Sequence, residues 1–143
     1  MASPLTMYVP IKQDESTQAL AKLAVENFTK GVQSGLDETK IVHYATLVLI
    51  PNTSGEGALG ILLTTRFDKA MIPYLETFWG SAEITEAITG LASIALNPPT
   101  LPIDTFDKFA NFINDTNLTP APEDLVWKNF YQAYTKTVEQ ILS

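Results

Sequence analysis

Apolar and β-branched residues are concentrated in two neighbouring runs, residues 41–50 and 60–67, separated by a polar stretch rich in glycine. This pattern predicts two strands joined as a β-hairpin. Residues 5–11 alternate β-branched, aromatic and apolar side chains and predict a further strand that ends near Pro10. The aromatic-rich residues 125–134 predict the last strand.

Between these strands the apolar residues recur at helical spacing. The first helix is expected after Asp14 or Ser16 as N-cap, with Gly35 as its end. Asp68 is the expected cap of the next helix, and Asp104 that of a later one. The spacing predicts helices over residues 14–35, 68–80, 81–96, 105–114 and 135–143.

The predicted order is strand, helix, hairpin, helix, two further helices, strand and helix. Such an order indicates an α+β protein with the ferredoxin-like β-α-β-β-α-β arrangement, in which extra helices precede the last strand. The handedness of crossovers favours an antiparallel sheet with helices on one face. We expect residues 1–143 to form a single domain, because this length fits one ordinary core.

The linker of the hairpin contains Gly55, Gly57 and Gly60 in the G-x-G-x-x-G spacing of dinucleotide-binding proteins. In those proteins the third glycine packs inside a helix whose N–H groups face the phosphates. Here Gly60 leads into a strand. We therefore expect the glycines to supply positive φ in the hairpin loop rather than to bind a nucleotide.

The chain has nine Lys and Arg against sixteen Asp and Glu, a net charge of −7, and no run of basic residues. Nucleic acids and anionic membranes are therefore unfavourable partners. No cysteine is present, which excludes thiolate catalysis and Cys-ligated metals, and we expect no metal or cofactor. The first residues lack the features of a signal peptide, and a cytoplasmic location is expected.

Several segments also resemble a known group of proteins. The runs LTMYVPIK, HYATLVLIP, LLTTRFD followed by YLETFW, and FYQAYTKTVEQI are similar to segments of small, mostly bacterial proteins of the dimeric ferredoxin-like (α/β-barrel) superfamily. The resemblance implies a homodimer in which two open sheet faces meet and enclose a pocket. It implies no chemistry, because one fold hosts many functions.

If the hairpin pairs about Gly55, Tyr44 lies opposite Arg66, and alternate side chains fall on two faces. The face with Ala45, Leu47 and Leu63 is the more apolar and should lie under the helices. The other face then presents candidate ligand-binding residues, with Tyr131 from the last strand beside them: Tyr44, Thr46, Thr64 and Arg66. An arginine there could bind a carboxylate or phosphate, or pair with an acidic neighbour or a dimer partner.

His43 is the only histidine. It is a candidate proton-transfer group or haem ligand, or a structural residue that hydrogen-bonds Asp68 or the backbone. The working hypothesis is a small-molecule-binding or accessory homodimer with an apolar pocket on the open sheet face, for an apolar or anionic ligand. The alternatives are a cofactor-independent monooxygenase or isomerase that uses His43 and Arg66, and a structural interaction module.

Overall fold

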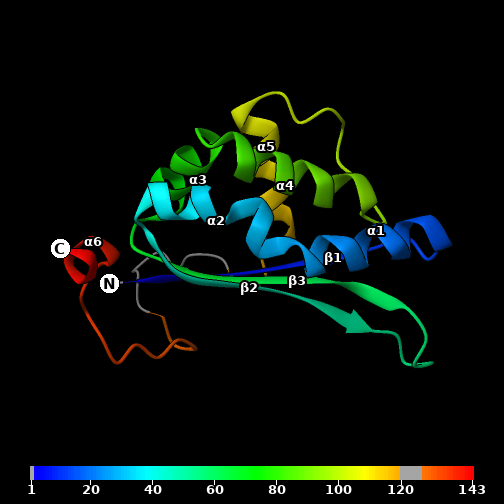
Figure 1. Ribbon diagram of the computed structural model, residues 1–143, viewed down its shortest axis with the longest axis horizontal. Helices are drawn as coiled ribbons and strands as arrows, with labels where there is room; N and C mark the ends of the chain where they lie inside the picture. Colours follow the sequence, from blue (N-terminus) through cyan, green and yellow to red (C-terminus); the bar gives the residue numbers. More distant parts are fainter. Residues whose placement is uncertain (1, 120–126) are drawn as a thin grey trace.

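Helices cover one face of a three-stranded antiparallel sheet in the computed structural model of the chain, which describes residues 2–119 and 127–143 (Figure 1). The described elements are β1 (Ser3–Pro10), α1 (Glu15–Glu26), α2 (Phe28–Thr39), β2 (Val42–Pro51), β3 (Ala58–Phe67), α3 (Met71–Trp79), α4 (Ala82–Ile94), α5 (Phe106–Thr116) and α6 (Val138–Leu142). The class is therefore α+β, as the sequence predicts. No helix among these elements combines the length and hydropathy needed to cross a membrane.

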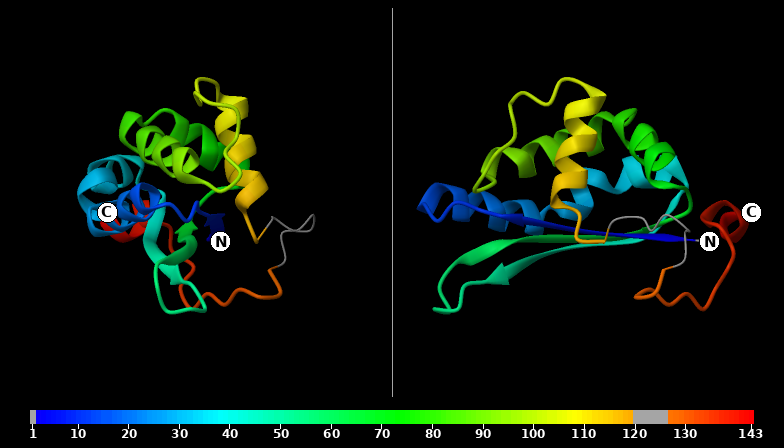
Figure 2. Two further views of the ribbon diagram at one scale, coloured as in Figure 1. Left: turned by 90° about the vertical axis from the view of Figure 1, so that its right-hand side faces the viewer. Right: turned by 180° about the vertical axis from the view of Figure 1, so that it is seen from behind.

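The strand order is β1-β3-β2, with β3 antiparallel to both neighbours. Strands β1 and β2 are consequently parallel to each other, and the crossover that joins them consists of α1 and α2. This is a split β-α-β unit with β3 inserted between its two strands. The left view shows the helical layer on one side of the sheet and the loop that precedes α6 on the other (Figure 2).

The hairpin between β2 and β3 confirms the interpretation of the glycine-rich stretch. Gly55 and Gly57 have φ of 84° and 70°, a region that suits glycine, in the loop that reverses the chain. Gly60 has another role inside β3, since a Cβ there would lie 2.6 Å from the Tyr8 ring and 2.7 Å from the carbonyl oxygen of Val9. The third glycine thus permits close contact between β3 and β1.

The expected last strand is not formed by residues 127–134, while 125 and 126 lie outside the described residues. Instead, isolated bridges join Met7 of β1 to Asn117, and Ile11, the residue that follows β1, to Ala95. Pro4 and Pro10 lack an N–H, which removes donors that a further strand would need. The full β-α-β-β-α-β prediction therefore reduces to three strands in the described part of the chain.

The first helix predicted over residues 14–35 is two helices. Asn27 ends α1 with its amide bonded back to the Leu23 carbonyl, and α2 then continues through Gly35 to Thr39. Gly35 is not a stop. It is buried against the start of α4, where a Cβ would lie 2.7 Å from Ser81 Oγ and its N–H donates to Glu83.

Candidate functional site

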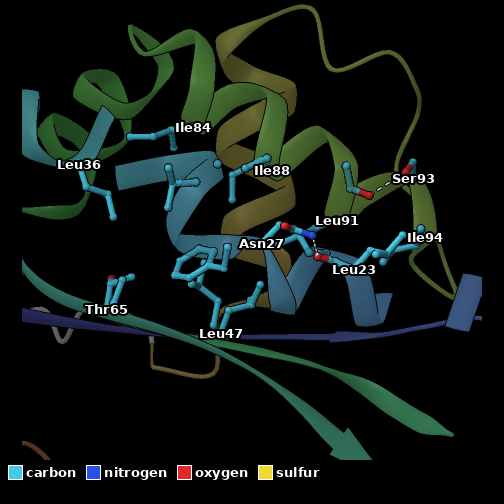
Figure 3. Close-up of a pocket in the computed structure, with 18 of the residues that line it drawn as sticks. Leu23, Asn27, Leu36, Leu47, Thr65, Ile84, Ile88, Leu91, Ser93 and Ile94 are labelled. Carbon is cyan, nitrogen blue, oxygen red and sulfur yellow. Dashed lines mark hydrogen bonds between the residues drawn. The ribbon is translucent and has the colours of Figure 1, made fainter. Parts of the chain in front are cut away.

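An apolar pocket of about 440 Å³ lies between the sheet and the helices that cover it. Figure 3 shows its side chains converging from above and below on the space between the ribbon layers. Residues of α1 and α2 form one wall, α4 forms the roof, and the sheet forms the floor. Its size lies within the range of small-molecule sites in proteins.

The roof and floor follow from the two periodicities of the sequence. Ile84, Ile88 and Leu91 recur every three or four residues and form a buried stripe along α4. Ala45 and Leu47 project from β2 on the same side of the sheet. The prediction that Ala45, Leu47 and Leu63 lie under the helices is confirmed, since all three line this pocket.

Small residues and exposed leucines define the mouth of the pocket. Leu20 and Leu23 on α1 are 54% and 53% exposed although they are large and apolar. Gly31 on α2 and Gly90 on α4 line the pocket in helix interiors, and a Cβ at either would meet nothing within 4 Å. Because glycine is less favourable than alanine in a helix, neither local geometry nor packing accounts for them.

None of the residues that line the pocket is ionisable, and few polar atoms reach it. The Asn27 amide donates to the Leu23 carbonyl, and the Ser93 hydroxyl donates to the Gly90 carbonyl (Figure 3). On the floor, the buried Thr65 hydroxyl lies 3.2 Å from the Tyr74 hydroxyl. Burial raises the pKa of Tyr74, so this tyrosine is a neutral hydrogen-bonding group.

The open face of the sheet carries four of the candidate residues in the expected register. Tyr44 is paired with Arg66, and Thr46 with Thr64, whose hydroxyl oxygens lie 2.5 Å apart. These four side chains alternate with those on the pocket floor. The structure brings them together, but they do not line the pocket described above.

Arg66 has two partners at this end of the sheet. Its guanidinium donates to the Thr65 carbonyl and lies over the Phe130 ring, 5.0 Å from the centroid. This places Phe130 of the C-terminal segment beside β3. Tyr131, the residue singled out from the sequence, is 86% exposed.

His43 lies where a β-bulge interrupts the pairing between Val42 and Tyr44, so the simple alternation does not fix its direction. Its Nε2 atom lies 2.6 Å from Asp68 Oδ1, in agreement with the structural alternative. It also borders a hollow of about 190 Å³ between α2 and β2, to which Arg66 does not contribute.

Asp68 does not cap α3 as expected. The N-cap of that helix is Ala70, which makes no side-chain cap, whereas Asp68 Oδ2 accepts the backbone N–H of Val138 at the start of α6. Asp104 is likewise not a cap, because Thr105 accepts the N–H of Lys108 while Asp104 pairs with the Lys108 side chain.

The sequence predicts the pocket on the open face of the sheet, but it lies on the face that the helices cover, and its lining residue Thr65 is not among the predicted site residues. The available signal was its position between two residues assigned to the open face, which puts a lone polar side chain on the apolar floor. The sequence predicts the helix that forms the roof. It does not predict the position of that helix beside α1 and α2, which depends on the packing of Gly35 against the start of α4.

Within residues 2–119 and 127–143, no cluster of three or more His, Asp or Glu side chains could hold a metal ion. Comparisons with protein-family models, with curated proteins and with solved structures find no match to this chain.

Proposed function

We propose that this protein binds a small apolar molecule in the pocket between α1, α2, α4 and the sheet. The observation that carries the proposal is the half-enclosed space of about 440 Å³ whose lining contains no ionisable side chain. An apolar cavity of about 150 Å³ already accepts benzene. On that scale this pocket has room for roughly 15–20 non-hydrogen atoms.

The two exposed leucines of α1 and the two glycines at the mouth support the same function. Leu20 and Leu23 would lose water contact only when the pocket is filled. Gly31 and Gly90 leave an opening that alanine or larger residues would narrow. A helix interior that needed only stability would favour alanine at both positions.

The test is native mass spectrometry of protein purified without added ligand, repeated under denaturing conditions. We expect an extra mass that disappears on denaturation, or uptake of the uncharged dye N-phenyl-1-naphthylamine with increased fluorescence. Ala87→Phe should abolish binding because Ala87 lines the pocket. Glu86→Phe, at the adjacent exposed position of α4, is the matched control and should retain it.

Failure of the protein both to retain a molecule and to bind the dye would contradict the proposal. Equal binding by the Ala87→Phe and Glu86→Phe variants would also contradict it, provided that both unfold cooperatively. The alternative enzyme built on His43 and Arg66 has no part in the proposal, because His43 is bonded to Asp68 whereas Arg66 lies over Phe130.

We also propose that the split β-α-β unit belongs to a ferredoxin-like fold and that a second copy of the chain covers the part of its open sheet face around Tyr44 and Val48, beside the contact of Phe130 with Arg66. Tyr44 and Val48 on that face are 63% and 44% exposed. Arg66 is the only charged residue in strands β1, β2 and β3. Although each copy has a net charge of −7, two copies that meet at this face would therefore not bring acidic side chains of the strands together. An uncharged, partly apolar patch suits a self-complementary interface.

Light scattering after size-exclusion chromatography tests the second copy. We expect a mass twice the 15.7 kDa of one chain. Val48→Asp should yield monomers by burying a charge in the interface, while Val48→Thr should remain dimeric. A monomeric wild-type protein at tens of micromolar would overturn this proposal and leave the pocket proposal standing.

A further inference from the structure

The charge of the pocket restricts the ligand that it can hold. A carboxylate or ammonium group inside it would lose its hydration without gaining a counter-ion, because the lining residues offer neither sign of charge. Helix ends of both signs border the pocket, the last turns of α1 and α4 and the first turn of α2, so the helix dipoles select neither sign of charge. The pocket therefore disfavours charged groups of either sign.

The shape of the pocket restricts the ligand further. Its roof runs from Ile84 to Ile94, almost the whole of α4. The ten helical steps from Ile84 to Ile94 extend about 15 Å. Figure 3 shows Leu36 and Thr65 toward one end of this space and Leu23 and Ile94 toward the other. A long, narrow molecule fits this space better than a compact one of equal volume.

One polar group on the floor remains able to bind a ligand. The Thr65 and Tyr74 hydroxyls form a single hydrogen bond, and both side chains are buried. Each hydroxyl has one O–H, so the pair uses one donor and leaves one. Within the described part of the chain neither oxygen makes another side-chain hydrogen bond. If Tyr74 donates to Thr65, the Thr65 O–H is available to an acceptor in the pocket.

From these three features we infer that the pocket binds an uncharged, elongated apolar molecule with one accepting oxygen, such as an alcohol or ketone, and that Thr65 donates to that oxygen. This inference rests on the proposed function and specifies its ligand class. It assigns binding to Thr65 rather than to its neighbour Thr64, which bonds Thr46 on the opposite face.

The experiment is displacement of N-phenyl-1-naphthylamine by 1-octanol, octane and octanoate at pH 8, where the carboxylate is ionised. We expect octanol to bind at least about tenfold more tightly than octanoate, because only the latter must bury a charge. Thr65→Val should weaken octanol binding about five- to tenfold and change octane binding less than twofold.

Two variants separate the hydroxyl from the packing. Thr64→Val is the matched control on the adjacent residue and should leave all three affinities unchanged. Thr65→Ser retains the hydroxyl and should keep the preference for octanol over octane. If Thr65→Val fails to fold, Tyr74→Phe tests the pair instead, because it removes the donor to Thr65. This variant should change the affinity for octanol more than the affinity for octane.

The outcomes distinguish this inference from the proposed function. Absence of dye binding defeats the proposed function itself. If the dye binds and octanoate binds as tightly as octanol, the inference of an uncharged ligand is wrong. If the dye binds and none of the three compounds displaces it, the inference of an elongated ligand is wrong. Thr65→Val and Thr64→Val with the same effect on octanol overturn the role of the Thr65 hydroxyl.

Discussion

The imidazole of His43 lies 2.6 Å from one carboxylate oxygen of Asp68, and the other oxygen accepts the backbone N–H of Val138 at 2.6 Å. Because a carboxylate only accepts, His43 Nε2 donates in this pair. The side chains of both residues are largely buried. Asp68 thereby connects the end of β3 to the start of β2 and to the C-terminal helix α6.

We predict that Asp68→Asn loosens the C-terminal segment. The substitution removes a charged acceptor from two hydrogen bonds, each worth about 1.5–3 kcal/mol when a charged group takes part. Trypsin cleavage at Lys128 and Lys136 should accelerate about tenfold or more. Asp104→Asn, which alters an exposed ion pair with Lys108, should leave this rate unchanged. Equal cleavage of wild type and Asp68→Asn would contradict the role of Asp68.

Alanine at the two glycines of α2 should have opposite effects on stability. Gly35→Ala places a Cβ against Ser81 and Ile84 and should lower the free energy of unfolding by about 1–3 kcal/mol. Gly31→Ala meets open space and should raise it by about 0.5–1 kcal/mol. Urea titrations of both variants measure the difference. Equal shifts would show that close packing at Gly35 is unimportant.

The N-cap of α1 should make stability depend on acid pH. Hydrogen bonds from Ser16 and Thr17 lower the pKa of Asp14 from 3.8 to about 2. The folded state therefore favours the ionised carboxylate, and its contribution is present above about pH 4 and lost as the pH falls toward 2. The melting temperature of wild type should approach that of Asp14→Asn over this range. A constant difference would contradict this assignment.

The hairpin could be predicted from the sequence because its determinants are local. Glycines with positive φ fix the loop, and alternation then sets which side chains share a face, including the Tyr44–Arg66 pair. Alternation does not predict the β-bulge at His43. The bulge directs the His43 side chain to Asp68, a partner that lies beyond the end of β3.

Features set by distant contacts could not be predicted. Asp68 has the right type and position for a cap of α3, but its acceptors are occupied by His43 and by Val138, 70 residues away. In the sequence Gly35 is typical of a helix end, and only its contact with Ser81 in the structure shows that it is a packing position. Residues 127–134 have strand-forming side chains, yet strand formation also requires a partner with free donors, and β1 presents Pro4 and Pro10 at its edge.

The contact between Arg66 and Phe130 should also stabilise the C-terminal segment. Phe130→Leu keeps an apolar side chain but removes the aromatic face, and a double-mutant cycle with Arg66→Gln should give a coupling energy of about 0.5–1 kcal/mol. Tyr131→Leu, at the adjacent exposed position, should show no coupling with Arg66→Gln. Coupling of Arg66 to Tyr131 instead of Phe130 would contradict this contact. The Arg66 guanidinium would then lie against the Tyr131 ring, and Tyr131 would belong to the open-face site, as the sequence predicts.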